Sequence, residues 1–300
     1  MANINTTPKT DVSVRHITYT PGRAKKNQQN YFTPETISKI ISLGIGKRQK
    51  IIIAAFLMSF GLLLAHSPSF IFLRTQMIII LGVGAYFISL WSLWEGLNRT
   101  KGIILMILPL MFTIAVASFY FLLPIRWLTR LPETAIFGFL FYSLLLAQNV
   151  FNVASMRTIP LYRAASTVSF LFTLVTSFLL YNVTFAFQLP FYWNGLFITL
   201  ITFPLILQHL WTFKMESITV QLLIYSLVMS LLVGEAAMVF SFWPSVSIIW
   251  SLFLVAFLYI ILAIITDFLR DRLDQSSMVE YVGVGATVIA ACLIVSYFSI

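Results

Sequence analysis

One carboxylate lies inside a long apolar segment and is the first candidate for chemistry. Glu235 falls within residues 217–240, where the other side chains are uncharged. An ionisable group costs at least about 2.5–3.5 kcal/mol to place in a membrane, so it indicates a functional site or an ion pair. The basic residues predicted on the same side are Arg74, Arg126 and Arg130. Two interpretations stay open: a structural ion pair with one of these arginines, and the handling of protons or cations.

A second group of polar side chains occupies the inner third of three apolar segments. Its members are Gln148, Asn149, Asn152, Gln208, His209 and Gln221. Gln148 and Asn152 are four residues apart, so they share one face of a helix. The group could form a vestibule open to the cytoplasm, where Arg157 and Arg163 would meet anionic lipid head groups. The alternative is hydrogen bonding between helices, worth about 0.6 kcal/mol per contact.

Motifs for metals, cofactors and catalysis are missing from the sequence. His209 has no second His, Cys or acid at ligand spacing, and the single cysteine is Cys292 in an apolar run. The charged segment 267–274 alternates acids with arginines, which is typical of a solvated turn. Nucleotide-binding and hydrolase signatures are absent. We therefore expect no metal and no cofactor, and the sequence does not predict an enzyme.

Membrane helices must position these candidates. Of the 300 residues, 59% are hydrophobic and 10% charged, and the mean hydropathy is +0.92. So few charges cannot cover a soluble globule. Spanning a bilayer takes about 20 helical residues. The candidate runs are 51–66, 76–94, 102–124, 134–154, 165–187, 190–211, 217–240, 243–266 and 280–299. The sequence thus predicts an all-α fold, a polytopic integral membrane bundle of about nine transmembrane helices.

The distribution of charge predicts the orientation. The net charge is +9, and nine of the 19 Lys and Arg residues lie in the first 50 positions. With nine spans, sixteen basic residues fall on the side of the N-terminus and three on the other. By the positive-inside rule the N-terminus is cytoplasmic and the C-terminus external. A membrane bundle of this kind is not expected to bind nucleic acid.

The first 50 residues divide into two predicted parts. Residues 1–32 are polar and basic, which predicts a flexible cytoplasmic tail attracted to anionic lipid head groups. Residues 33–50 begin with a helix-start pattern and carry isoleucines at helical spacing, which indicates an amphipathic helix on the membrane surface. The alternative is a simple extension of the first span. Residues 51–300 form the predicted bundle.

One stretch carries a resemblance to other proteins. The segment Gln148–Val153, followed by Arg157–Ala165, resembles uncharacterised multi-pass membrane proteins of small-genome bacteria. The resemblance implies a bacterial cytoplasmic membrane and no defined activity. It transfers no functional residue.

Three functions stay open on the sequence. The first is a non-enzymatic component that assembles with or supports other membrane proteins, for which a small-residue face at Gly283 and Thr287 is a candidate contact. The second is a small-solute or lipid transporter, suggested by Glu235, the polar group, and Pro109 and Pro204 in the third and sixth runs. The third is a lipid-modifying membrane enzyme, which would need acids or histidines converging near the arginines.

Overall fold

The computed structural model describes residues 46–65, 73–95, 97, 99–122, 127–154, 161–214, 218–243, 246–270 and 274–299. The chain divides into two units, residues 1–44 and 45–300, and every described residue belongs to the second. The predicted tail over 1–32 therefore lies outside the described residues, as does most of the predicted surface helix over 33–50. The first described helix begins at Lys47, so the end of that segment extends the first span.

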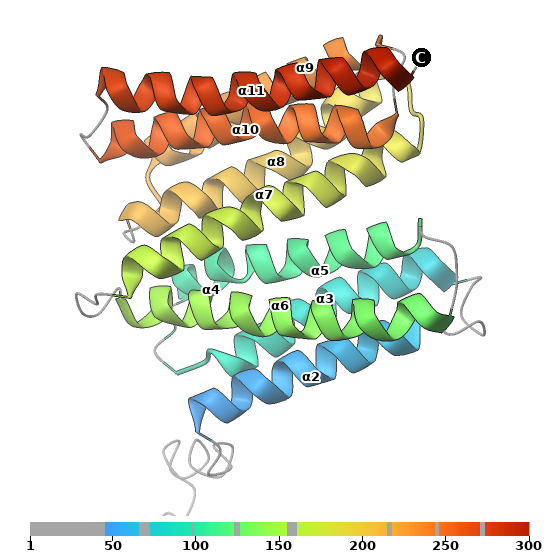
Figure 1. Ribbon diagram of the computed structural model, residues 1–300. Helices are drawn as coiled ribbons and strands as arrows, with labels where there is room; N and C mark the ends of the chain where they lie inside the picture. Colours follow the sequence, from blue (N-terminus) through green and yellow to red (C-terminus); the bar gives the residue numbers. More distant parts are fainter. Residues whose placement is uncertain are drawn as a thin grey trace, which may run out of the picture. The chain divides into compact units, whose positions relative to one another are not determined.

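The described ranges fold into ten helices and contain no strand (Figure 1). The helices are α2 (Lys47–Ala65), α3 (Arg74–Ser92), α4 (Arg99–Leu105), α5 (Ile107–Tyr120), α6 (Trp127–Ala154), α7 (Tyr162–Ala186), α8 (Phe191–Lys214), α9 (Val220–Phe240), α10 (Ser247–Leu269) and α11 (Gln275–Ser299). With α4 and α5 taken together, nine helical segments among these residues are long and apolar enough to cross a membrane. The all-helical class and the nine candidate spans are thus confirmed.

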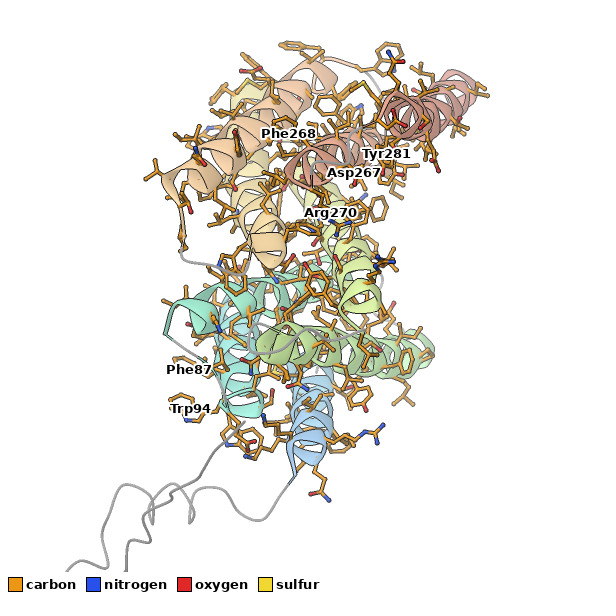
Figure 2. All side chains as sticks on the ribbon, turned by 90° about the vertical axis from the view of Figure 1, so that its left-hand side faces the viewer. Phe87, Trp94, Asp267, Phe268, Arg270 and Tyr281 are labelled. Atoms are coloured by element: carbon orange, nitrogen blue, oxygen red, sulfur yellow. The ribbon has the colours of Figure 1, made fainter. Side chains whose placement is uncertain are left out.

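The outer surface of the bundle carries many large apolar side chains. Phe87 is 61% exposed and Trp94 is 67% exposed, and Figure 2 shows both pointing away from the helices. A water-soluble protein rarely leaves a large continuous apolar surface uncovered. A surface of this kind suits contact with lipid.

The third apolar run forms two helices. α4 ends at Leu105 and α5 begins at Ile107, with Met106 between them. Pro109 in the first turn of α5 has no amide hydrogen to donate to the carbonyl of Leu105, which explains the break. Pro204, in contrast, lies inside an uninterrupted α8.

α7 is the central helix and α11 is peripheral. α7 contacts α5, α6, α8 and α10, and 13 of its 25 residues are buried. α11 packs on α10, and only 11% of its apolar 18-residue window is buried. The centre of the bundle therefore lies around α7, and α11 is a loosely packed helix at its edge.

Glycines join α8 and α9, the most extensive helix pair in the bundle. A Cβ atom added to Gly234 would lie 1.9 Å from the hydroxyl of Thr199 and 2.8 Å from the carbonyl oxygen of Gly195. The two backbones therefore approach as closely as small residues allow. α8 is fixed on one side by α9 and on the other by α7.

Candidate functional site

A cavity of about 690 Å³ lies at the end of the bundle where α7 begins and α8 and α10 end. We call it the Arg270 pocket. Four helices line it, namely α7, α8, α10 and the start of α11. Its ionisable lining residues include Arg163, His209, Asp267 and Arg270. Its aromatic lining residues are Tyr162, Phe170, Phe213, Tyr259 and Tyr281.

His209 is the most deeply buried ionisable group of the pocket. Only 3% of its surface is exposed, and its ring packs against Phe170 and Phe213 at centroid distances of 5.2 and 5.1 Å. Its Nε2 atom lies 3.2 Å from the hydroxyl oxygen of Thr266. Its Nδ1 atom is buried and has no hydrogen-bond partner in the described part of the chain. A buried polar atom of this kind needs water or a ligand.

The acid and the arginine at the end of α10 have different partners. The hydroxyl of Tyr281, on α11, donates a hydrogen bond to Asp267. The guanidinium of Arg270 lies 4.4 Å from the centroid of the Phe213 ring, in cation–π contact. Figure 2 shows Asp267, Arg270 and Tyr281 close together, where α10 ends beside the start of α11.

The two arginines leave the pocket with an excess of positive charge. Among the described residues, the ion pairs within 4.0 Å are those of Glu95 with Lys47 and Lys50. Neither Arg163 nor Arg270 therefore forms an ion pair with a carboxylate of the described residues. Two guanidinium groups beside aromatic walls suit an anion attached to an apolar body, because arginine forms paired hydrogen bonds with phosphate or carboxylate.

The pocket contains two hydrogen-bonded pairs of polar side chains. His209 lies beside the hydroxyl of Thr266, and Asp267 accepts a hydrogen bond from the hydroxyl of Tyr281. In the described ranges no three His, Cys, Asp or Glu residues are close enough to hold a metal ion.

The structure divides the predicted polar group. His209 lines the pocket together with Arg163, whose side chain is exposed. Gln221 is exposed on α9, and Arg157 lies outside the described residues. Of the predicted polar group, the lining of the Arg270 pocket thus includes His209 alone.

The remaining members of the group lie on α6 and α8, outside the pocket lining. Gln148 and Gln208 are buried, and neither amide atom of either side chain has a hydrogen-bond partner among the described residues. Asn149 is half-buried. Asn152 is buried, and its Nδ2 atom donates to the carbonyl oxygens of Leu93 and Glu95 at 3.1 Å each. Asn152 therefore joins α6 to the end of α3.

Glu95 extends this junction to α2. Its carboxylate accepts a hydrogen bond from the ammonium of Lys50 at 2.9 Å and lies 3.4 Å from that of Lys47. The hydrogen bond from Lys50 is the main reason that the pKa of Glu95 lies below its usual range, and partial burial opposes this shift. Ionised Glu95 thus ties the start of α2 to the end of α3.

The Glu95 contact makes stability depend on pH. A carboxyl whose pKa is lowered by folding stabilises the folded protein above its unfolded pKa, about 4.3 for Glu. The contribution disappears as the pH falls through the lowered pKa of the folded state. We expect Glu95→Gln to lower the melting temperature in detergent at pH 7 and to have little effect at acid pH. Glu280→Gln, at an exposed carboxylate, is the control, and a pH-independent effect of Glu95→Gln would contradict the assignment.

Glu235 does not form the predicted ion pair with Arg130. Its side chain is exposed on α9, and no ion pair joins it to Arg130 within the described residues. α9 packs against α8 through the face that carries Gly234. Glu235, the next residue, is turned away from this face and is exposed. The side chains of Arg74 and Arg126 lie outside the described residues.

Sequence reasoning missed some of the charged positions. Asp267 and Arg270 belong to the segment interpreted as a solvated turn, but α10 continues to Leu269 and carries Asp267 into the pocket lining. The alternation of acids and arginines in this segment was the available sequence signal for a charged site.

Comparisons with known proteins place the chain in one family. A family model described as "Protein of unknown function (DUF5656)" matches residues 70–295, from the end of the first hydrophobic run to the last helix. No curated protein and no solved structure matches significantly. Because the match covers most of the sequence, the chain belongs to the DUF5656 family of proteins of unknown function.

Proposed function

We propose that this protein is an integral membrane protein that binds a phosphate-bearing amphiphile in the Arg270 pocket, as a lipid transporter or lipid carrier does. In this proposal it lies in a bacterial cytoplasmic membrane, with the N-terminus cytoplasmic and the C-terminus external. The nine long apolar helices and the concentration of basic residues near the N-terminus support the membrane location and orientation.

The observation that carries the proposal is a pair of arginines beside a buried imidazole, with neither arginine in an ion pair with a described carboxylate. In the proposed orientation, α7 begins and α8 and α10 end at the cytoplasmic surface, at the depth of lipid head groups. Arg163 and Arg270 would bind the phosphate oxygens, and the unpartnered Nδ1 atom of His209 would contact the same group.

The aromatic lining favours an amphiphile over a free anion. Tyr162, Phe170 and Tyr259 offer ring surface to the apolar part of a ligand, and such rings are favoured at membrane interfaces. The lining includes neither Asn152 nor Glu235, so the support is for a binding site at one surface rather than a continuous channel.

Assembly with other membrane proteins is the second candidate function. Gly283 and Thr287 are exposed on α11, the least buried span, and the hydroxyl of Thr287 donates back to the carbonyl of Gly283 at 2.8 Å. Small residues of this kind allow close approach of another helix. This candidate rests on that exposed face alone.

Binding of phosphatidic acid tests the pocket. We expect dioleoyl phosphatidic acid to raise the melting temperature of the purified protein in a neutral detergent, because a ligand stabilises the state that binds it. Arg270→Gln removes a charge-assisted hydrogen bond worth about 1.5–3 kcal/mol, so it should weaken binding roughly tenfold to a hundredfold. The midpoint of a lipid titration followed by thermal unfolding measures this change.

The control variant is Arg48→Gln, at an exposed arginine on α2. It removes the same charge away from the pocket and should leave the titration midpoint unchanged. Dioleoyl phosphatidylcholine should stabilise the protein less, because its head group carries no net charge. Equal titrations of the unmodified protein and Arg270→Gln would refute the proposed site.

A further inference from the structure

The break between α4 and α5 lies among helices that carry two buried, unpartnered glutamines. Gln148 on α6 is 0% exposed and Gln208 on α8 is 2% exposed. Neither Nε2 nor Oε1 of either side chain has a hydrogen-bond partner in the described part of the chain. Leaving a buried amide without partners costs roughly 1–3 kcal/mol, so such groups in native proteins usually bind water or a ligand.

The two glutamines lie at the same depth in the bundle. Tyr162 connects their helices, because its ring contacts Phe151 of α6 at 5.8 Å and its hydroxyl donates to the carbonyl of Thr212 in α8 at 2.8 Å. Gln148 precedes Phe151 by three residues and Gln208 precedes Thr212 by four. Each glutamine is thus about one helical turn further into the bundle than the residue that meets Tyr162.

The helix break lies between the same two elements. α4 contacts both α6 and α8, and its last residue, Leu105, is 0% exposed, as is Met106. Because Pro109 cannot donate an amide hydrogen, the carbonyl of Leu105 lacks its usual helical partner. α4 is only seven residues long, so this carbonyl lies two turns from the start of the helix, in the interior.

We infer that Gln148, Gln208 and the carbonyl of Leu105 surround a second binding site, which we call the break site. Its ligand is a small neutral molecule that both donates and accepts hydrogen bonds, and water is the smallest molecule of this class. The three groups are uncharged, and two amide donors beside a carbonyl acceptor match a ligand with both capacities. Broken membrane helices bind polar ligands through backbone groups released in this way.

The break site is independent of the proposed lipid pocket. Gln208 and His209 are neighbours in the sequence, but consecutive residues point about 100° apart around a helix. His209 lines the Arg270 pocket, whereas Gln208, Gln148 and Leu105 do not. The break site can therefore exist whether or not the pocket binds a lipid, and its test requires no lipid.

A double-mutant cycle tests the break site through a shared ligand. Methionine matches glutamine in length and is apolar, so we compare Gln148→Met, Gln208→Met and the double variant by thermal unfolding in detergent. If one ligand bridges the two amides, each single variant should lower the melting temperature by about 2 °C or more. The double variant should lose no more than the worse single variant, because the ligand is already lost.

Other outcomes of this cycle would overturn the inference. If the amides have no ligand, each methionine should raise the melting temperature, and the two effects should add. Additive losses would also contradict a shared ligand. Gln221→Met, at an exposed glutamine on α9, is the control and should have no effect.

Deuterium uptake by the unmodified protein gives a second measurement if the methionine variants do not fold. Water or another exchangeable ligand at the break should let the amides of Met106–Leu108 exchange faster than those in the middle of α7. Equally slow exchange in both segments would overturn the break site, because it would indicate a dry, closed interior.

Discussion

Gly234→Ala is expected to lower the free energy of unfolding by about 1–3 kcal/mol, the usual cost of overpacking a close contact. The added methyl carbon would lie 2.8 Å from the carbonyl oxygen of Gly195 and 3.2 Å from the Cβ atom of Thr199. The Thr199 hydroxyl could rotate away, but the backbone oxygen cannot move without separating α8 from α9. Gly234→Leu should be more damaging still. Thermal and denaturant unfolding in detergent measure the loss.

The control for this prediction is Gly84→Ala on α3. A Cβ atom at Gly84 would meet nothing within 4 Å, so alanine should be neutral or slightly stabilising through its higher helix propensity. If Gly234→Ala behaved like Gly84→Ala, the close contact between α8 and α9 would not exist.

The helices could be predicted because their signal is local. A segment that crosses a membrane must be apolar over about 20 residues and must satisfy its own backbone, so each run identifies a helix without knowledge of its neighbours. The errors lie at the ends. α2 begins at Lys47 and α6 at Trp127, each before the apolar run, because a helix can continue into charged residues outside the lipid.

The candidate site could be predicted only in part because it depends on which face each helix turns inward. His209 was a candidate and does line the pocket, but its neighbour Gln208 does not. Asp267 and Arg270 were interpreted as a solvated turn because the sequence does not reveal that α11 folds back along α10 and brings Tyr281 to Asp267. Such non-local packing has no signature in composition or spacing.

Glu235 illustrates the same limit for a single residue. Its segment and its charge were read correctly from the sequence, but the side chain is exposed on α9. Small residues determine which face of α9 packs inward, and Gly234 meets α8 at the closest contact. The direction of the carboxylate is therefore a consequence of its neighbour.

Asn152→Asp should destabilise the protein strongly although it changes only one atom of the side chain. The Nδ2 atom of Asn152 donates to the carbonyl oxygens of Leu93 and Glu95, and the side chain is only 1% exposed. A carboxylate in its place would set negative oxygens against two carbonyl oxygens, and a protonated acid could donate to only one of them. We expect a loss of about 3 kcal/mol, because the carbonyl of Leu93 loses a donor, that of Glu95 keeps the more distant Lys47 ammonium at 3.4 Å, and a charge is buried.

Asn149→Asp provides the matched control, three residues earlier on α6 and half-buried. It introduces the same charge where water or lipid head groups can reach it, so the loss should be much smaller. Asn152→Ala separates the two causes, because it removes the donor without adding charge and should fall between the two aspartate variants. Thermal unfolding at pH 7 gives the order. If Asn152→Asp were as stable as Asn149→Asp, the side chain of Asn152 would not join α6 to the end of α3.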